Sequence, residues 1–285
     1  MKHFALCLND KYVPYACVTI QSILMHHRKE NVTFHLITDG FTEKSTQLLY
    51  RLVGGEKNLN IYQVKDDTKL DGLNMAWSKF GWYRLFLPEY LPSAIDRVLY
   101  LDCDVCVTDK LDELFDIDME ERAIAGAMDP ESYSSSVYDR LGIVPKKGYV
   151  CSGVLMLNLD YWRQHNIAEQ VLDYGKKYPE KTLFPDQDAI NVICQDAKVI
   201  LSPKYSPFLR IAKFFNKEEW NEYISHPAII HYAGCAPWKG NPNNHPFHYY
   251  WWEAFNAMPF NFWNVRYGFW KCQMKFLIKK LLYRL

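Results

Sequence analysis

The chain has 285 residues, with 33 basic and 33 acidic side chains and a formal net charge of zero. This balance provides no overall positive field, so it disfavours a protein that binds nucleic acid. The composition, 49% hydrophobic and 23% charged, is typical of a folded globular protein and excludes a mainly disordered chain.

The predicted elements begin with alternating strands and helices. Apolar runs predict strands at residues 3–8, 32–37 and 59–64, and helix-spaced apolar residues predict helices at 12–27 and 43–53. This alternation predicts an α/β fold with a mostly parallel sheet that helices cover on both faces. Ligands of such sheets bind beyond the carboxyl ends of the strands, so we expect chemistry in the loops there.

Further along the chain, the same patterns predict strands at 97–101, 154–159 and 228–230, and helices at 162–178 and 186–194. The sequence contains no internal repeat and no low-complexity linker. We therefore expect one main domain over residues 1–246, followed by a distinct segment over residues 247–285.

Secretion and membrane spanning are disfavoured. The apolar run Phe4–Leu8 is shorter than a signal-peptide core, and no window approaches the ~20 apolar residues of a membrane-spanning helix. The eight cysteines are scattered, and several lie in apolar runs, as buried thiols do. We expect a cytoplasmic protein without a disulfide framework.

The strongest candidate site lies in RVLYLDCDVCV, residues 97–107, where an apolar strand leads into Asp102 and Asp104. Positions i and i+2 of an extended chain point to the same side, so the two carboxylates could share one cation. Such oxygen ligands favour Mg²⁺ or Mn²⁺. The alternative is a solvated turn after an edge strand.

His231 ends another apolar strand, just before a loop of small residues that contains Gly234. It could complete an Asp/Asp/His metal site, and the glycine would let the backbone approach a phosphate. The alternative is a core or surface histidine without a ligand.

Two other motifs are ambiguous. Cys103 and Cys106 form a CxxC pair, but no second CxxC or HxxxH exists to complete a zinc site. A thioredoxin-like pair would open a helix, whereas this pair continues a strand. In FPDQD, residues 184–188, Asp186 is either a helix N-cap or, with Gln187, part of a sugar pocket.

Six motifs in this order resemble glycosyltransferase family 8. They are Asn9-Asp10-x-Tyr12, Trp82-Tyr83-Arg84, VLYLDCDV, SGVLMLNLDYWR, FPDQDAIN and HYAGCAPW. The bacterial lipo-oligosaccharide galactosyltransferases are the most similar members, with glycogenin more distant, and the resemblance covers residues 3–240.

The resemblance implies a GT-A fold and a retaining transfer of glucose or galactose from a UDP-sugar to a cell-surface glycan, with Mn²⁺ or alternatively Mg²⁺. It implies metal ligation by Asp102, Asp104 and His231. It implies donor binding by Asn9, Tyr12, Arg84, Cys103, Cys151, Ser152, Gly234 and Lys239. It places Asp186 on the donor sugar and phosphate, Gln187 beside the reacting carbon and Asp129 in the sugar or acceptor cleft.

The sequence departs from the family pattern at three positions. Asn9 stands where members usually have Asp, and Cys151 stands where they commonly have Asn. Ala236 occupies the position of a common lysine, so Lys239 would have to meet the pyrophosphate instead. Because an amide such as Gln187 is a poor nucleophile, we expect the acceptor to attack from the face that UDP leaves.

Aromatic and basic residues concentrate at the C-terminus. Residues 247–270 include 12 aromatic side chains, and residues 264–285 include six basic side chains and no acidic one. This mixture suits the headgroup layer of an anionic membrane, so we expect peripheral attachment to the inner face of the cell membrane. The alternatives are rings that pack on the domain or line an acceptor groove, and a solvated basic helix.

Two other functions stay open at this point. A metal-dependent phosphohydrolase could use the same carboxylates, and a catalytically silent glycan- or lipid-binding protein would explain Asn9 and Cys151.

Overall fold

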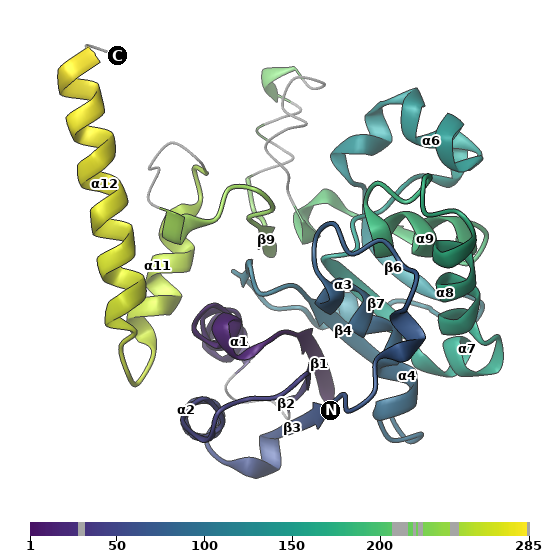
Figure 1. Cartoon of the computed structure of the whole chain (residues 1–285), viewed down its shortest axis with the longest axis horizontal. Coiled ribbons are helices and arrows are strands. Elements are labelled where there is room, and N and C mark those ends of the chain that lie inside the picture. Colours follow the sequence, from purple (N-terminus) through teal and green to yellow (C-terminus); the bar gives the residue numbers. More distant parts are fainter. Residues whose placement is uncertain (28–31, 207–215, 219–220, 222–224, 240–244, 284–285) are drawn as a thin grey trace.

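The computed structural model describes residues 1–27, 32–206, 216–218, 221, 225–239 and 245–283. Its centre is a seven-stranded sheet in the order β3-β2-β1-β4-β7-β6-β8 (Figure 1). The strands are β1 (Lys2–Cys7), β2 (Val32–Thr38), β3 (Leu59–Gln63), β4 (Arg97–Leu101), β6 (Ile124–Ala127), β7 (Val154–Asn158) and β8 (Lys198–Leu201). The predicted strands of this sheet are therefore confirmed to within a residue or two at each end.

The sheet is mostly parallel, as expected. Strand β1 pairs in parallel with β2 and β4, β2 with β3, and β6 with β8, whereas β7 runs antiparallel to both β4 and β6. A second, two-stranded sheet pairs β5 (Val105–Val107) antiparallel with β9 (Ile229–His231). This small sheet continues from the carboxyl end of β4 and brings a distant part of the chain to that end.

Helices cover both faces of the sheet, and each face has its own apolar core. The helices are α1 (Val13–His27), α2 (Glu43–Val53), α3 (Lys79–Tyr83), α4 (Leu87–Tyr90), α5 (Asp112–Phe115), α6 (Ser135–Leu141), α7 (Leu159–Gln164), α8 (Ile167–Lys177), α9 (Pro185–Ile193), α11 (His248–Ala257) and α12 (Trp263–Tyr283). Helices α1, α2 and α11 contribute to one core, and α3, α4, α7, α8 and α9 to the other. The predicted α/β architecture is confirmed.

The predicted single helix over residues 162–178 is wrong. The chain forms two helices, α7 and α8, because Asn166 adopts a left-handed backbone conformation with φ of 51° between them. Asparagine tolerates this conformation better than most residues. By contrast, α2 has the predicted bounds, with Thr42 capping its start and Gly54 ending it at φ of 81°.

The C-terminal segment contains two different helices. Trp251 and Phe255 of α11 are buried in the core beside α1. Helix α12 lies at the edge of the molecule and contacts the 3-10 turn Pro237–Lys239 (Figure 1). Within the part of the chain that the structure describes, no helix has both the length and the apolarity to cross a bilayer.

Candidate active site

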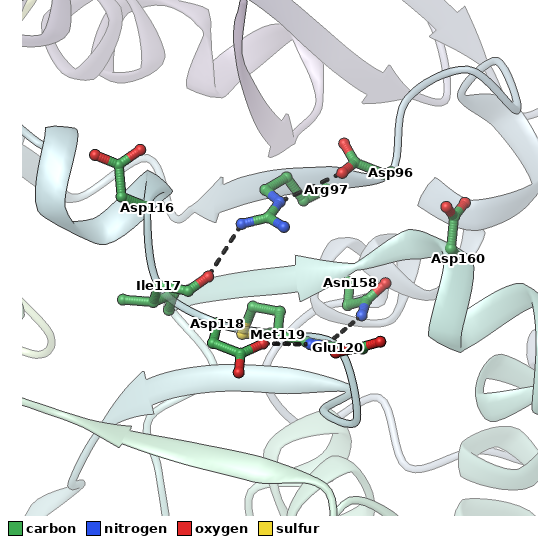
Figure 2. Close-up of a pocket in the computed structure, with 9 residues that line it drawn as sticks. All are labelled: Asp96, Arg97, Asp116, Ile117, Asp118, Met119, Glu120, Asn158 and Asp160. Atoms are coloured by element: carbon green, nitrogen blue, oxygen red, sulfur yellow. Dashed lines mark hydrogen bonds and ion pairs between the residues drawn. The ribbon is translucent and has the colours of Figure 1, made fainter.

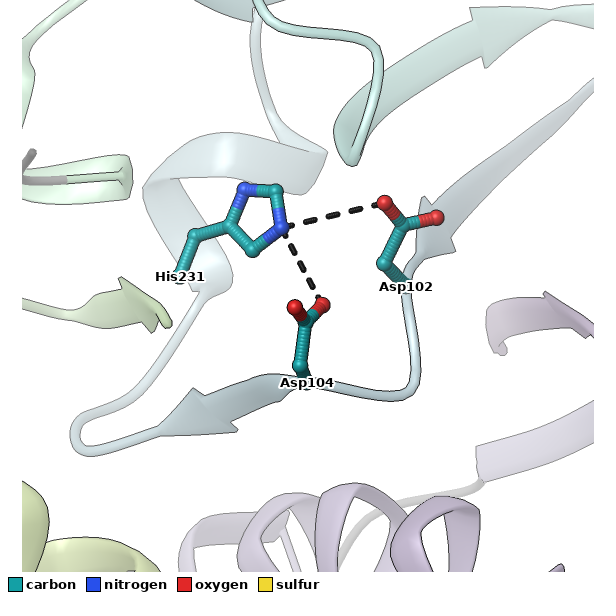
Figure 3. A group of neighbouring side chains, drawn as sticks. All are labelled: Asp102, Asp104 and His231. Atoms are coloured by element: carbon teal, nitrogen blue, oxygen red, sulfur yellow. Dashed lines mark hydrogen bonds and ion pairs between the residues drawn. The ribbon is translucent and has the colours of Figure 1, made fainter. Parts of the chain in front are cut away.

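Three candidate metal ligands converge at the carboxyl end of β4. Asp102 follows β4, Asp104 precedes β5 and His231 is the last residue of β9 (Figure 3). The His231 Nε2 atom lies 3.1 Å from an Asp104 oxygen and 3.7 Å from an Asp102 oxygen. Among the described residues, this is the one group of three such side chains whose ligand atoms all lie within 4.8 Å.

The two aspartates meet through a turn and not through the alternation of an extended strand. Residues 103 and 104 form the turn between β4 and β5, and the Tyr232 amide donates to the Asp104 carbonyl at 2.9 Å. The hydroxyl of Thr19 on α1 donates to the carbonyls of Cys103 and Val105, which fixes this turn against the helix. The expected convergence of the carboxylates is therefore present, but its geometric basis differs from the predicted one.

Gly153 provides the space that the site requires. Its carbonyl accepts from the Asp102 amide at 2.9 Å, so the residue lies directly beside the carboxylates. A Cβ atom at this position would lie 2.6 Å from an Asp102 side-chain oxygen and would overlap the His231 ring. A glycine is therefore required for Asp102 and His231 to approach each other.

The charges within the site fit a divalent cation. Burial alone would lower the pKa of His231, but Asp104 and then Cys151 outweigh it and raise this pKa well above its usual value. Burial would raise the pKa of Asp104, but the charge and hydrogen bond of His231 lower it overall. Two carboxylates suit Mn²⁺ or Mg²⁺, and the imidazole adds a nitrogen ligand once a cation displaces its proton, so these residues fit the implied metal.

Asp102 is fixed by two residues on the side away from His231. The Tyr100 hydroxyl donates to Asp102 Oδ1 at 2.7 Å, and an Arg84 nitrogen lies 3.3 Å from the same oxygen. Its Oδ2 atom is the one that faces His231. Sequence reasoning missed Tyr100. This residue lies on β4 two positions before Asp102, and such spacing in an extended chain directs both side chains to the same side.

Arg84 connects Asp102 to Asp186. Its guanidinium is buried, stacks 4.1 Å from the centre of the Tyr100 ring, donates to the Ser152 carbonyl and lies 3.3 Å from Asp186 Oδ2. Burial raises the pKa of Asp186 in spite of this cation. The Asp186 Oδ2 atom has no hydrogen-bond donor within the described part of the chain, so it retains the capacity to accept one.

Gln187 is fixed at the start of α9. Its Oε1 accepts from the Ser152 amide at 2.8 Å, and its Nε2 donates to the Tyr149 hydroxyl at 3.0 Å. The same hydroxyl donates to Asp188 at 2.6 Å, and Arg140 forms two further hydrogen bonds with that carboxylate. Sequence reasoning included Asp188 in the FPDQD motif without giving it a role, and it missed Tyr149 and Arg140, because these contacts join segments that are far apart in the chain.

The loop after β1 contains the candidate nucleotide-binding residues. Asn9 Oδ1 is buried and has no hydrogen-bond donor among the described residues. Tyr12, half exposed, stands edge-on to Tyr15, and Tyr15 stacks 4.2 Å from Trp238. An unsatisfied acceptor beside an exposed ring is compatible with a planar base that donates hydrogen bonds.

The loop after β9 carries the candidate diphosphate-binding residues. Gly234 has a left-handed φ of 73°, and the position where its Cβ would lie is open. Lys239 lies close enough to Asp104 to lower the pKa of that carboxyl, after the larger effects of burial and His231. The positive charge of Lys239 therefore lies near Asp104, one of the candidate metal ligands.

The remaining predicted residues are buried next to these. Cys103 lies in the turn between the two aspartates, and Ser152 contacts both Arg84 and Gln187. Asp129 follows β6, where its side chain caps the turn Pro130–Tyr133 by accepting from the Glu131 amide at 2.9 Å. Cys151 turns its sulfur toward His231, 3.5 Å from Nδ1.

A cavity of about 470 Å³ lies elsewhere, beside the first residue of β4 and the last of β7. Its acidic side chains are Asp96, Asp116, Asp118, Glu120 and Asp160. Figure 2 shows the carboxylates spread around the cavity, and Arg97 bonded to the carbonyl of Ile117. The carboxylates do not converge, so this cavity is not a second metal site.

Comparison with known proteins is consistent with this arrangement. Lipopolysaccharide 1,2-glucosyltransferase of Escherichia coli is 28% identical over 241 residues, which cover 81% of this chain and 71% of that protein. General stress protein A of Bacillus subtilis is 24% identical over 277 residues, covering 92% of this chain and 95% of that protein.

Among solved structures, galactosyltransferase LgtC in complex with donor and acceptor sugar analogues matches with a TM-score of 0.82 and 23% identity. The match covers 93% of this chain and 99% of LgtC, which confirms the expected GT-A fold. The sequence model of glycosyl transferase family 8 matches residues 3–241. Since that range is most of the chain, the protein belongs to glycosyl transferase family 8.

Proposed function

We propose that this glycosyltransferase is a retaining enzyme that moves glucose or galactose from a UDP-sugar to a saccharide of a cell-surface glycan. The observation that carries the proposal is the Asp102, Asp104 and His231 group beside the buried Arg84 and Gln187 and the partly buried Asp186. The first group suits a divalent metal ion bound to the diphosphate of the donor. The second group provides polar atoms for the sugar that is attached to this diphosphate.

The metal would be held by Asp102, Asp104 and His231, and when bound it would supply positive charge that stabilises the UDP leaving group. Mn²⁺ is the proposed ion, with Mg²⁺ as the alternative. Lys239 would add a second positive charge near the diphosphate, and Gly234 would let the backbone approach it closely. Asn9 and Tyr12 would bind the uracil and ribose.

The sugar would lie between the metal site and α9. Asp186 Oδ2 would accept a hydrogen bond from a sugar hydroxyl, since this buried atom lies beside Arg84 and has no hydrogen-bond donor among the described residues. The Gln187 Oε1 atom accepts one hydrogen bond from Ser152 and retains a lone pair that could stabilise positive charge on the sugar. Asp129 would line the acceptor side of the cleft.

We propose same-face attack for the retaining step, with the departing phosphate oxygen accepting the proton of the acceptor hydroxyl. Gln187 is an uncharged amide whose two polar atoms are both bonded, so it does not serve as a nucleophile. Trapping of a glycosylated side chain by mass spectrometry would contradict this route. Formation of a product with the opposite anomeric configuration from the donor would contradict retention.

The acceptor proposal rests on the relatives. The similar protein of Escherichia coli is named a lipopolysaccharide 1,2-glucosyltransferase, and LgtC is named a galactosyltransferase. We therefore propose a lipopolysaccharide or lipo-oligosaccharide as the acceptor, and a hexose of either configuration as the donor group.

The test is UDP release across a panel of UDP-sugars with Mn²⁺, with and without glycan acceptors. We expect donor-selective turnover that increases with the acceptor and is lost in Asp104→Ala. The matched control is Asp118→Ala, which removes a carboxylate from the separate cavity. Turnover of phosphate esters without an acceptor would favour a phosphohydrolase, and no UDP release under any condition would favour a silent binding protein.

We also propose that α12 attaches the protein to the inner face of the cell membrane. Four large side chains, spaced by four, three and four residues, are more than half exposed along this helix: Trp263, Tyr267, Trp270 and Met274. This spacing places them on one helical face. The basic residues of the same segment would meet anionic headgroups, and the buried rings of α11 would stay in the protein.

A further inference from the structure

The second nitrogen of His231 faces away from the carboxylates. Its Nε2 lies 3.1 Å from Asp104, while Nδ1 lies 3.5 Å from the sulfur of Cys151. Both residues are buried, and each belongs to an ordered part of the fold: His231 ends β9 and Cys151 precedes Gly153 and β7. The ring is therefore held between a carboxylate and a thiol.

The position of the sulfur is also fixed from another side. The Gly153 amide donates to Cys151 Sγ at 3.3 Å, and the Cys151 amide donates to the Ala127 carbonyl at 3.0 Å. These bonds direct the thiol toward the imidazole. The sulfur thus accepts from the Gly153 amide, faces His231 Nδ1 and lies behind the candidate metal ligands.

An imidazole that binds a cation through Nε2 must carry its remaining proton on Nδ1. That N–H requires an acceptor, because a buried donor without a partner costs free energy and lets the ring turn. Metal-binding histidines usually use a carboxylate or a carbonyl for this purpose. Here the geometry offers sulfur, which is a weaker acceptor.

We propose that Cys151 is a positioning residue that accepts a hydrogen bond from His231 Nδ1 and so directs the Nε2 lone pair toward the metal. This role replaces the donor-sugar contact that the family resemblance implied for this position. The inference rests on the proposed metal site, but it assigns to this cysteine a task that the motif alone does not indicate.

The direct test is the affinity for Mn²⁺, measured from the electron paramagnetic resonance signal of the free ion in titrations without any sugar substrate. Cys151→Ala removes the acceptor, and we expect it to weaken Mn²⁺ binding about 10-fold, as outer-shell changes commonly do. Cys151→Ser retains an acceptor and should keep most of the affinity. Cys194→Ala, which removes another fully buried thiol at the end of α9, should not change it.

A second readout reports on the histidine itself. Electron spin echo envelope modulation of bound Mn²⁺ detects the nitrogen of a coordinated imidazole, and His231→Gln identifies that signal. We expect the nitrogen modulation in the wild type and in Cys151→Ser, and a weaker one in Cys151→Ala at saturating Mn²⁺. If the alanine variant does not fold, Cys151→Val fills the space of the thiol without an acceptor and takes its place.

Two failures can be told apart. If Asp104→Ala binds Mn²⁺ as well as the wild type, the proposed metal site is wrong. If Asp104→Ala loses Mn²⁺ but the Cys151→Ala and Cys151→Val proteins keep wild-type affinity and nitrogen modulation, the metal site stands and the role of Cys151 is overturned.

Discussion

The active site and helix α12 depart from the usual distribution of residues in opposite ways. Around the site, charged and polar side chains such as Arg84, Gln187 and His231 are buried. On α12, the large rings of Trp263 and Trp270 are more than two thirds exposed. Folding alone favours neither arrangement, because a buried polar group loses its solvation by water and an exposed ring forgoes the gain from apolar burial.

The difference indicates two separate tasks. Buried polar groups are held in one geometry by their partners, as catalysis requires, whereas the exposed rings would be buried in a membrane under the attachment proposed above. Changes in one region should therefore leave the readout of the other unchanged. Variants can test this separation by measuring metal affinity, sugar transfer and vesicle binding on the same protein.

The largest expected effect is that of Asp104→Ala. Loss of one carboxylate from the proposed metal site should reduce sugar transfer by at least about 100-fold, since charge on the leaving group would no longer be stabilised. Binding to anionic vesicles should stay at the wild-type level. Retained transfer in this variant would contradict the proposed metal site, and a loss of vesicle binding as well would contradict the separation of the two regions.

Gly153→Ala tests the space inside the site. The added methyl group would lie 2.6 Å from an Asp102 oxygen and would overlap the His231 ring, so the ligands must separate. We expect Mn²⁺ affinity to fall about 10- to 100-fold. Gly268→Ala on α12, where nothing lies within 4 Å of the added atom, is the matched control and should leave Mn²⁺ binding unchanged.

The double variant Trp263→Ser/Trp270→Ser tests α12. Removal of two exposed rings should weaken binding to vesicles of anionic lipid about 10-fold or more, because ring burial contributes strongly at the interface. Transfer to a short, soluble acceptor should not change. Sedimentation with the vesicles measures this binding. Tyr249→Ser, which removes an exposed ring from α11, is the control and should sediment like the wild type. Wild-type sedimentation of the double variant would overturn the attachment proposal.

Tyr100→Phe should produce a smaller effect on the site. It removes the hydroxyl that donates to Asp102 Oδ1 at 2.7 Å, while Arg84 still holds the same oxygen. We therefore expect Mn²⁺ affinity to fall only several-fold, less than the effect of outer-shell changes that leave a ligand without a partner. Isothermal titration with Mn²⁺ measures this change. An affinity equal to that of the wild type would mean that Arg84 alone orients Asp102.

The sequence predicted those parts of the fold and site that depend on local pattern. The strands up to residue 101, helix α2 and the position of Asp102 and Asp104 after β4 all follow from apolar periodicity and turn residues. The break at Asn166 was missed, because the helical spacing of apolar residues continues on both sides of it.

Contacts between distant segments could not be predicted in this way. The bond between Tyr149 and Asp188, and the approach of Cys151 to His231, depend on how strands and helices pack. The same holds for His3 and His35, whose rings meet only because β1 and β2 pair in one particular register. Family motifs identify residues, but they do not indicate which side chains fix those residues in place.

The pair of His35 and His3 is a polar cluster outside the proposed active site, so it tests whether every buried polar group of this protein serves the reaction. His35 Nε2 lies 3.0 Å from His3 Nδ1, and the other His35 nitrogen lies 3.2 Å from the Tyr62 hydroxyl, away from the metal ligands. Burial, reinforced by His3, lowers the pKa of His35 from 6.5 to about 3. The folded protein thus keeps His35 neutral in a range where the unfolded chain would protonate it.

The lowered pKa of His35 makes the stability of the protein depend on pH. Below pH 6.5 the unfolded state binds a proton that the folded state does not, so the free energy of unfolding falls as the pH falls toward the folded-state value. We expect wild-type stability to decrease between pH 6 and 4 more steeply than that of His35→Phe, by up to about 1 kcal/mol per pH unit. Urea unfolding at several pH values measures this slope, with exposed His165→Gln as the control. Because this cluster serves packing and not the reaction, Mn²⁺ affinity in His35→Phe should equal that of the wild type, and a changed affinity would contradict that assignment.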